Sequence, residues 1–428
     1  MPSRAFRSLF RRAVGLGLIV GGAMGAAPGA SAQTQGIEFG GVDPETPARI
    51  QSVAALGMGG ADVATVRTAT LFDNPALLTR LDLSRPRLTF LGVRGRLSTD
   101  TFGKLRVARR VQDEFEAGLD DLYEEDPAAF DALVDEVESV GRAQHVSGVL
   151  VKGPSVAMRV RGAAVSAGIY GRSVQRLRII PNSVSATVDA FAQADVVVPV
   201  SVAMEVPGTD WQPGGGLSIG VTGRYLRRHV SAKQKQLEQL TENEQLYVLA
   251  GSAVGVDVGV LYQNAMPGLD VGLTLHHLLG GEPRLTPYRS ISVGDSAVVD
   301  EDEIADLAAR FNGRGASRRF TLGATYRVPL TPRHGLQGMT VGLDWVGEDT
   351  AEFDQPTGLT RVRLGLEAEL TGFLAVRSGI SQGYPSVGAS IQTRYFAIDY
   401  AYYGVEDGRL PGQLPRYNHA LELRFGLF

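Results

Sequence analysis

The chain contains no cysteine among its 428 residues, so disulfide bonds cannot stabilise it. An exported protein is free to use disulfides, and their absence indicates a fold large enough to be stable without them. After Met24 the sequence also lacks an apolar run close to the about 20 residues that a membrane-spanning helix needs. If this protein crosses a membrane, it must do so with strands, and only a closed barrel pairs every backbone polar group in lipid.

Motifs of catalysis and metal binding are absent as well. The six histidines form no HExxH pattern, and no GxSxG motif marks a nucleophilic serine. We expect His276 and His277, which are adjacent in a strand, to point to opposite faces. The cluster from Gly57 to Gly60 is not followed by the Lys-Ser/Thr of a phosphate-binding loop. These absences predict that the protein is not an enzyme and holds no cofactor or metal.

Residues 1–32 have the features of a secretory signal peptide. Four arginines precede an apolar run over residues 13–24, and small residues suited to cleavage end at Ala32. The run is too short for a spanning helix. Removing this segment takes the formal net charge from -4 to about -8, because it carries four arginines and no acidic residue. That negative charge argues against a nucleic-acid partner.

The last segment of the sequence alternates apolar and polar residues. Leu421, Leu423, Phe425 and Leu427 share one face of a strand, because side chains in a strand alternate with period two. The other face carries charged and small residues. A half-buried strand of a soluble protein shows the same alternation, so the number of such segments decides between a soluble sheet and a membrane barrel.

Fourteen segments with this period occur from residue 87 to the end, near the length that a tilted strand needs to cross a bilayer. They cover residues 87–97, 155–161, 164–178, 196–206, 216–229, 247–261, 269–278, 317–328, 339–347, 360–370, 373–381, 386–394, 396–404 and 417–428. Short and long connections alternate between them, as in bacterial barrels. We therefore predict an all-β fold, a 14-stranded antiparallel transmembrane β-barrel over residues 84–428.

The charged face of these strands should line the lumen, where opposite charges pair across strands or hold an internal segment. The predicted lumen-facing charged residues are Arg327, Asp344, Arg361, Arg363, Glu367, Glu369 and Asp399.

Two long connections carry helical insertions, at residues 100–145 and 282–316. Residues 111–140 hold twelve acids and no Lys or Arg, with apolar residues at helical spacing, and residues 300–311 form a second acidic amphipathic pattern. A solvated structural role is the simpler interpretation. Calcium binding is the alternative, but the ligand spacing of an EF-hand is missing.

Residues 33–83 lie ahead of the first strand and fit neither a strand nor an ordinary linker. Small residues over 55–64 permit tight packing, and we predict that this segment folds inside the barrel as a hatch. The residues expected to bind ligand or to act in gating are Met58, Leu71, Phe72, Asn74, Pro75 and Leu77.

The stretch Gly57-Met58-Gly59-Gly60-Ala61, followed by Asn74-Pro75-Ala76, resembles the hatch of the FadL-like outer-membrane transporters of long-chain fatty acids and hydrocarbons. It is similar also to the TraF-like barrels of conjugal transfer. The specific motif covers residues 55–78. The resemblance implies fourteen strands around an N-terminal plug and hydrophobic substrates. This chain departs from that pattern in its acidic external loops and in Phe428, which falls on the polar phase of the last strand.

Two functions remain open. The first is an outer-membrane channel for hydrophobic or amphipathic small molecules, gated by its hatch. The second is a structural or assembly component of a conjugal-transfer or secretion apparatus, without transport. In both cases the expected location is the outer membrane of a Gram-negative-type bacterium. The expected partners are membrane lipid, lipopolysaccharide and the barrel assembly machinery, with a hydrophobic small molecule for the channel.

Overall fold

We describe a computed structural model of the chain. The described residues are 50–65, 74–99, 128, 132, 145–180, 187–209, 215–236, 244–280, 283–293, 301–312, 318–330, 335–349, 361–406 and 415–428. The predicted signal peptide, the expected helical stretch 111–140 apart from residues 128 and 132, and hatch residues Leu71 and Phe72 lie outside them. In these ranges no helix is long and apolar enough to cross a membrane.

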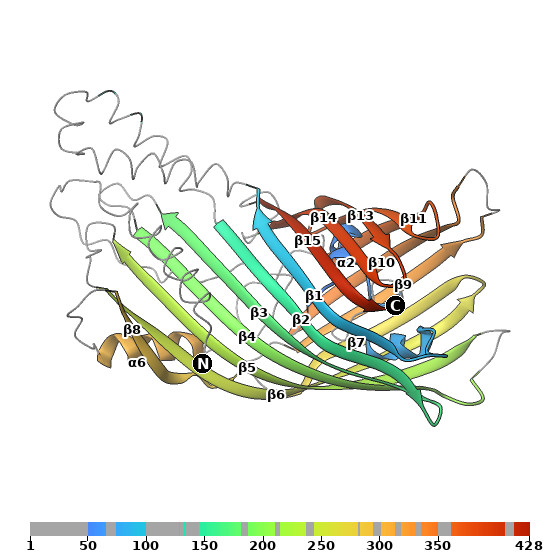
Figure 1. Ribbon diagram of the computed structural model, residues 1–428, viewed down its shortest axis with the longest axis horizontal. Coiled ribbons are helices and arrows are strands. Elements are labelled where there is room, and N and C mark those ends of the chain that lie inside the picture. Colours follow the sequence, from blue (N-terminus) through green and yellow to red (C-terminus); the bar gives the residue numbers. More distant parts are fainter. Residues whose placement is uncertain are drawn as a thin grey trace.

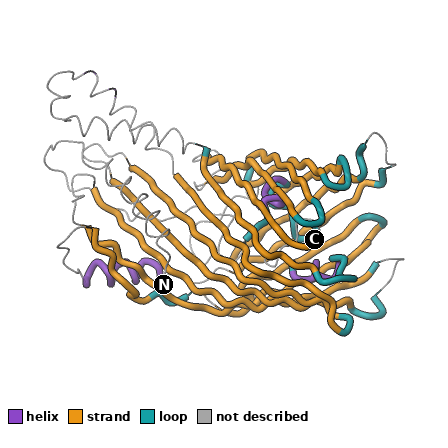
Figure 2. Tube along the Cα trace, in the orientation of Figure 1, coloured by secondary structure: helices purple, strands orange, loops and turns teal. Residues whose placement is uncertain are grey.

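Fifteen strands form one sheet, shown in Figures 1 and 2. They are β1 (Arg87–Ser98), β2 (His145–Val160), β3 (Ala163–Ile180), β4 (Thr187–Glu205), β5 (Gly216–Gln236), β6 (Glu244–Met266), β7 (Leu269–Gly280), β8 (Thr286–Val293), β9 (Arg318–Val328), β10 (Gly338–Asp349), β11 (Val362–Glu369), β12 (Leu374–Ser381), β13 (Tyr384–Gln392), β14 (Phe396–Glu406) and β15 (Pro415–Leu427). All pairings are antiparallel.

The sheet closes on itself because β1 pairs with both β2 and β15. β7 pairs with β9, so β8 stands outside the ring and fourteen strands form the barrel. The predicted 14-stranded antiparallel barrel is confirmed. Closure leaves the ring without an exposed edge, which satisfies the backbone groups of the first and last strands.

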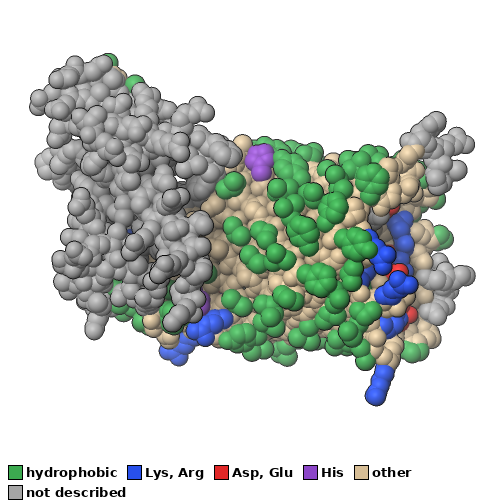
Figure 3. Space-filling model, viewed as in Figure 1, with side chains coloured by type: hydrophobic (Ala, Val, Ile, Leu, Met, Phe, Trp, Pro, Cys, Tyr) green, Lys and Arg blue, Asp and Glu red, His purple; other side chains and the backbone are tan. Residues whose placement is uncertain are grey.

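Side chains alternate between the lumen and the outer surface along each strand. On β11, for example, Leu364 and Leu366 are exposed, whereas Arg363 and Glu367 are buried. Every strand of the ring presents large apolar residues outward, and Figure 3 shows apolar side chains spread over the middle of the barrel. Such an apolar belt around a polar interior is the surface that a lipid bilayer requires of a barrel.

The two ends of the barrel differ in their connections. At one end the strands are joined by tight turns such as Arg161-Gly162, where Gly162 has a φ of 89° that favours glycine. The C-terminus lies at this end (Figure 1). The longer connections emerge at the other end, as the sequence predicts. We call the two ends the short-turn end and the long-loop end.

The insertion predicted at 282–316 is only partly helical. α6 (Glu301–Asn312) matches the predicted helix, but β8 precedes it and pairs with the long-loop half of β6. β8 was missed because β6 is 23 residues long and outreaches β7, which leaves a free edge for an added strand. α6 packs Leu307 against Val230 of β5 and Leu249 of β6.

Candidate functional site

Residues 50–65 and 74–83, here called the inner segment, lie inside the barrel (Figure 1). α2 (Val53–Gly57) begins at Ser52, whose hydroxyl accepts the N–H of Ala55, and contacts β12–β15. The short 3₁₀ helix η2 (Pro75–Arg80) begins at Asn74 and contacts β3–β6. A five-residue helix has no stability of its own. The barrel wall therefore holds the inner segment in shape.

Polar side chains of the wall hold the backbone of the inner segment. The Oδ2 atom of Asp344 accepts hydrogen bonds from the N–H groups of Asp62 (2.8 Å) and Val63 (3.0 Å). Arg94 of β1 donates to the carbonyl of Gln51, on the opposite side of the lumen. Both side chains are at most 4% exposed, so these charge-assisted bonds are shielded from water.

Asn74 connects the two parts of the inner segment to the wall. Its side-chain amide donates to the carbonyl of Val63 (3.1 Å) and to that of Val260 in β6 (2.9 Å), and its Oδ1 caps Ala76. A buried amide that bonds to three backbone groups fixes one conformation.

Inward-facing glycines let the inner segment approach the wall at backbone distance. One lies on each of eight neighbouring strands of the ring, and we call the set the glycine seat: Gly220, Gly259, Gly272, Gly323, Gly342, Gly365, Gly379 and Gly388. A Cβ atom added at Gly220 would lie 2.5 Å from the carbonyl carbon of Pro75, and one at Gly365 would lie 2.5 Å from the carbonyl oxygen of Met58. No real Cβ atom tolerates such contacts. The seat runs from β5 to β13.

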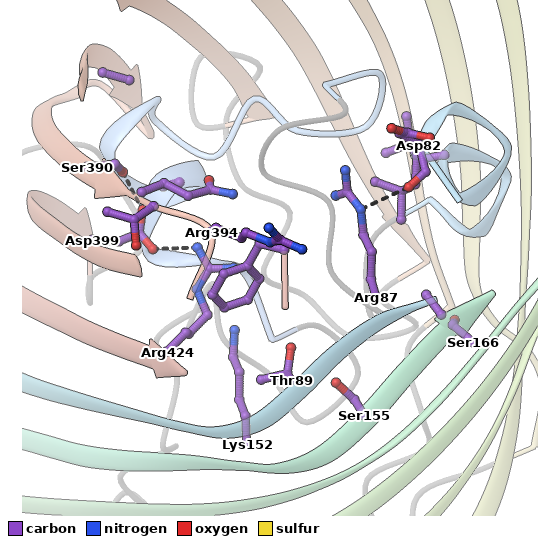
Figure 4. Close-up of a pocket in the computed structure, with 18 of the residues that line it drawn as sticks. Asp82, Arg87, Thr89, Lys152, Ser155, Ser166, Ser390, Arg394, Asp399 and Arg424 are labelled. Carbon is purple, nitrogen blue, oxygen red and sulfur yellow. Dashed lines mark hydrogen bonds and ion pairs between the residues drawn. The ribbon is translucent and has the colours of Figure 1, made fainter. Parts of the chain in front are cut away.

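Free volume lies across the lumen from much of this seat. A cavity of about 790 Å³ is lined by parts of the inner segment, by β1–β3 and by the short-turn halves of β12–β15 (Figure 4). Leu77, Leu78 and Leu81 form its apolar side, and turn residues such as Phe373 and Arg394 line it at the short-turn end. At this end Asp82 also lines the cavity, and hydrogen bonds from Ser84 hold the pKa of its carboxyl below the ordinary value.

The strand side of the cavity carries a continuous row of paired charges, the charge ladder, whose members are Lys152, Glu422, Arg424, Asp399, Ser390, Arg377 and Glu367. Lys152 Nζ lies 2.6 Å from Glu422 Oε1, Arg424 lies 2.7 Å from Asp399, and Arg377 lies 2.6 Å from Glu367. Ser390 joins Asp399 to Arg377. Three cations and three carboxylates compensate one another, so the ladder is neutral.

The ladder also crosses the seam at which the first and last strands meet. Gly92 of β1 pairs with Lys152 on one side and with Arg424 on the other, and its missing side chain lets the ladder pass over β1.

Lys152→Met should weaken the barrel by about 3 kcal/mol, because it leaves the buried Glu422 carboxylate without its nearest cation. Urea unfolding of the protein in lipid vesicles measures this loss. The double variant Lys152→Met/Glu422→Gln removes the uncompensated charge and should recover most of the stability. Equal stability of the single and double variants would contradict a structural role for the pair.

Most predicted site residues lie in the inner segment or on the wall around it. Met58, Asn74, Pro75 and Leu77 are buried in the inner segment, and Met58 touches the seat at Gly365. Leu71 and Phe72 are not among the described residues.

The predicted lumen charges fall into three groups. Asp344 and Arg363 bond to the inner segment, Arg363 through the carbonyl of Gly60 at 3.5 Å. Glu367 and Asp399 belong to the charge ladder. The remaining three, which are partly or fully exposed near strand ends, are Arg327, Arg361 and Glu369. The guanidinium of Arg327 lies 3.1 Å from the carboxylate of Asp270.

The expected divergence of His276 and His277 is wrong. Both are buried, because His277 has a φ of 55° and the β6–β7 pairing is irregular beside it. His276 Nδ1 lies 3.6 Å from Asp257, and the N–H of His277 donates to the same carboxylate. The described residues contain no group of three or more potential ligands placed to hold a metal ion.

Lys152 and the glycine seat are the features that the sequence interpretation missed. Lys152 lies outside the predicted strand 155–161, which begins after the Gly153-Pro154 pair. Glycine at alternate positions inside strands was the available signal for the seat, since glycine there marks close approach of another backbone.

Fold and lumen together define the class of protein: a closed antiparallel barrel with an apolar outer belt, occluded by a segment of its own chain. No family model and no curated protein matches the chain.

Several solved structures are similar to it. They include the Ralstonia pickettii toluene transporter TbuX (12% identity, 88% of this chain and 98% of that chain, TM-score 0.47). The CymD monoaromatic hydrocarbon channel (11%, 89% and 97%, 0.47) and the Pseudomonas putida toluene transporter TodX (9%, 89% and 98%, 0.46) are further examples. These are hydrocarbon transporters, the kind of protein that the inner-segment motif resembles.

Proposed function

We propose that the protein is an outer-membrane channel that passes hydrophobic or amphipathic small molecules through the cavity beside its inner segment. The cavity itself carries this proposal, because it reaches the short-turn end and combines an apolar side with a polar wall. Binding sites for small molecules commonly have this composition and this range of volume. A barrel with a purely structural role has no need of a cavity that its own inner segment leaves open.

The outer-membrane location rests on the apolar belt together with the charged lumen. Lipid and lipopolysaccharide are the proposed neighbours of the belt, and insertion would use the barrel assembly machinery after removal of the signal peptide near Ala32.

We further propose that η2 is the moving part of the gate. The glycine seat and Asp344 hold the stretch around Met58 and Val63 at backbone distance, which opposes removal of the whole inner segment. η2 is held at its start, by Gly220 and Asn74, but its residues Leu77 and Leu78 and the adjoining Leu81 face the cavity, where there is room for movement. A shift of η2 would widen the passage and leave the rest of the inner segment in place.

Uptake of radiolabelled toluene, 1-dodecanol and dodecanoate by cells with and without the protein tests the function. Expressing cells should take up at least one probe severalfold faster. Ala157→Trp, which fills the cavity, should abolish the gain, whereas Ala389→Trp on the outer surface should not. Correctly folded protein that accelerates no probe would overturn the channel and favour the alternative, an assembly component of a conjugal-transfer or secretion apparatus.

A further inference from the structure

Two neighbouring strands bulge beside the cavity. The pairing of β1 with β15 shifts between Thr89 and Leu91, and the pairing of β2 with β3 shifts between Lys152 and Ser155. Because a bulge inserts an unpaired residue, it re-aims the side chains next to it. Consistent with this, Phe90 and Leu91 are both exposed on the outer surface, although they are adjacent in sequence.

The bulges turn the hydroxyl groups of Thr89 and Ser155 into the cavity, and Ser166 faces it by the regular alternation of β3. Thr89 pairs with Ser155 across β1 and β2, and Ser166 of β3 pairs with Ala157, two residues further along β2. All three hydroxyl-bearing residues line the cavity, as Figure 4 shows. We call Thr89, Ser155 and Ser166 the hydroxyl row.

One member of the row is buried without a hydrogen-bond partner. Ser166 is 1% exposed, and its Oγ atom makes no hydrogen bond within the described part of the chain. A buried hydroxyl without a partner carries a free-energy cost, because it has lost its hydrogen bonds to water and gained none in the protein. A polar atom supplied by a molecule in the cavity would remove that cost.

The ladder charges beside the row are already paired with one another. Lys152, the nearest buried cation along β2, is already 2.6 Å from Glu422, and Arg424 is bonded to Asp399. A carboxylate beside them would add a negative charge to a compensated set. Arg87, which also lines the cavity and pairs with Ala157 beside Ser166, already donates to the carbonyl of Asp82 at 3.1 Å. The opposite side of the cavity is apolar, with Leu78 and Leu81.

We propose that the cavity recognises uncharged oxygenated molecules, such as an alcohol, phenol or ketone on an apolar body, with the oxygen at the hydroxyl row and the body against η2. This inference rests on the proposed channel function and narrows its substrate class. A bare hydrocarbon leaves Ser166 without a partner, and a polar site discriminates strongly against an analogue that cannot bond to it.

The test compares uptake of radiolabelled 1-dodecanol, dodecane and dodecanoate by cells that express the wild type or the triple variant Thr89→Val/Ser155→Ala/Ser166→Ala. The wild type should favour 1-dodecanol. The triple variant should lose about tenfold of that uptake, as expected for about 1.4 kcal/mol of hydrogen bonding, and keep its uptake of dodecane. Thr274→Val/Thr321→Val is the matched control: it removes two buried hydroxyls on β7 and β9 that do not line the cavity, and should change neither uptake.

Heat-modifiable migration on gels verifies folding of each variant. Equal uptake of 1-dodecanol and dodecane by the wild type, or a preference for dodecanoate, would overturn the substrate class and leave the channel standing. If the triple variant lost uptake of all three probes equally, the proposed substrate class would also be overturned, because the hydroxyl row would then act through packing. Failure of the wild type to accelerate any probe is a different result, since it overturns the channel itself.

Discussion

Gly220→Val should open the lumen. The new Cβ atom would lie 2.5 Å from the carbonyl carbon of Pro75, and this backbone is anchored by Asn74, so η2 cannot yield by a small adjustment. Overpacking of this kind costs about 1–3 kcal/mol, which shifts the balance between seated and displaced inner segment by about ten- to a hundredfold. Planar-bilayer recordings should show larger and more frequent openings than in the wild type, and cells should become sensitive to large hydrophilic antibiotics.

Gly223→Val on the same strand provides the control. A Cβ atom there meets no atom within 4 Å, because Gly223 has the opposite strand phase and faces outward. This variant should conduct like the wild type. If both variants open the channel equally, loss of a glycine in β5 acts through the strand itself, and the seat does not hold the inner segment.

The sequence predicted the ring of strands well, because period-two alternation holds over most of the barrel and breaks only locally, as in β1 and β7. It underestimated strand length, most clearly in β2, where 155–161 was predicted and His145–Val160 is observed. Gly153-Pro154 has the composition of a turn, but a bulge at that point absorbs the pair and the strand continues. β8 was not predicted either, because it pairs with the end of β6 that extends beyond the neighbouring strand β7.

The sequence predicted which charged residues face the lumen, but not which groups these residues bind. Alternation identified Asp344, Arg363 and Glu367 as inward-facing without showing which of them would hold the inner segment. That information depends on where α2 and η2 settle, which no local pattern encodes. The contact of Lys152 with Glu422 joins residues 270 positions apart and exists only after the barrel closes.

The strand phase of Phe428 indicated on which side of the barrel wall its side chain lies. Its position on the polar phase placed it apart from the apolar set of the last strand, and in the structure it lines the cavity, with the Arg424 guanidinium 5.5 Å from its ring centre. The terminal aromatic residue therefore contributes to the lumen of this protein and not to its lipid-facing belt.

Asp344→Ala should release the inner segment from the wall at a second point. The substitution leaves the N–H groups of Asp62 and Val63 buried without acceptors, and each such loss costs about 1–3 kcal/mol. Because the chain has no cysteine, Val63→Cys introduces a unique label into a side chain that is 2% exposed. Maleimide labelling at this site should be slow in the otherwise wild-type protein and about a hundredfold faster with Asp344→Ala.

Asp257→Ala separates release of the inner segment from general loosening of the barrel. Asp257 is equally buried, at 2% exposure against 1% for Asp344, but it bonds to Arg224 and to the N–H of His277, both on the wall. It should destabilise the barrel without speeding the labelling of Val63→Cys. Fast labelling in both variants would mean that the inner segment follows barrel stability. Fast labelling with Asp344 intact would mean that the segment leaves its seat unaided, so that the gate would be the whole inner segment and not η2 alone.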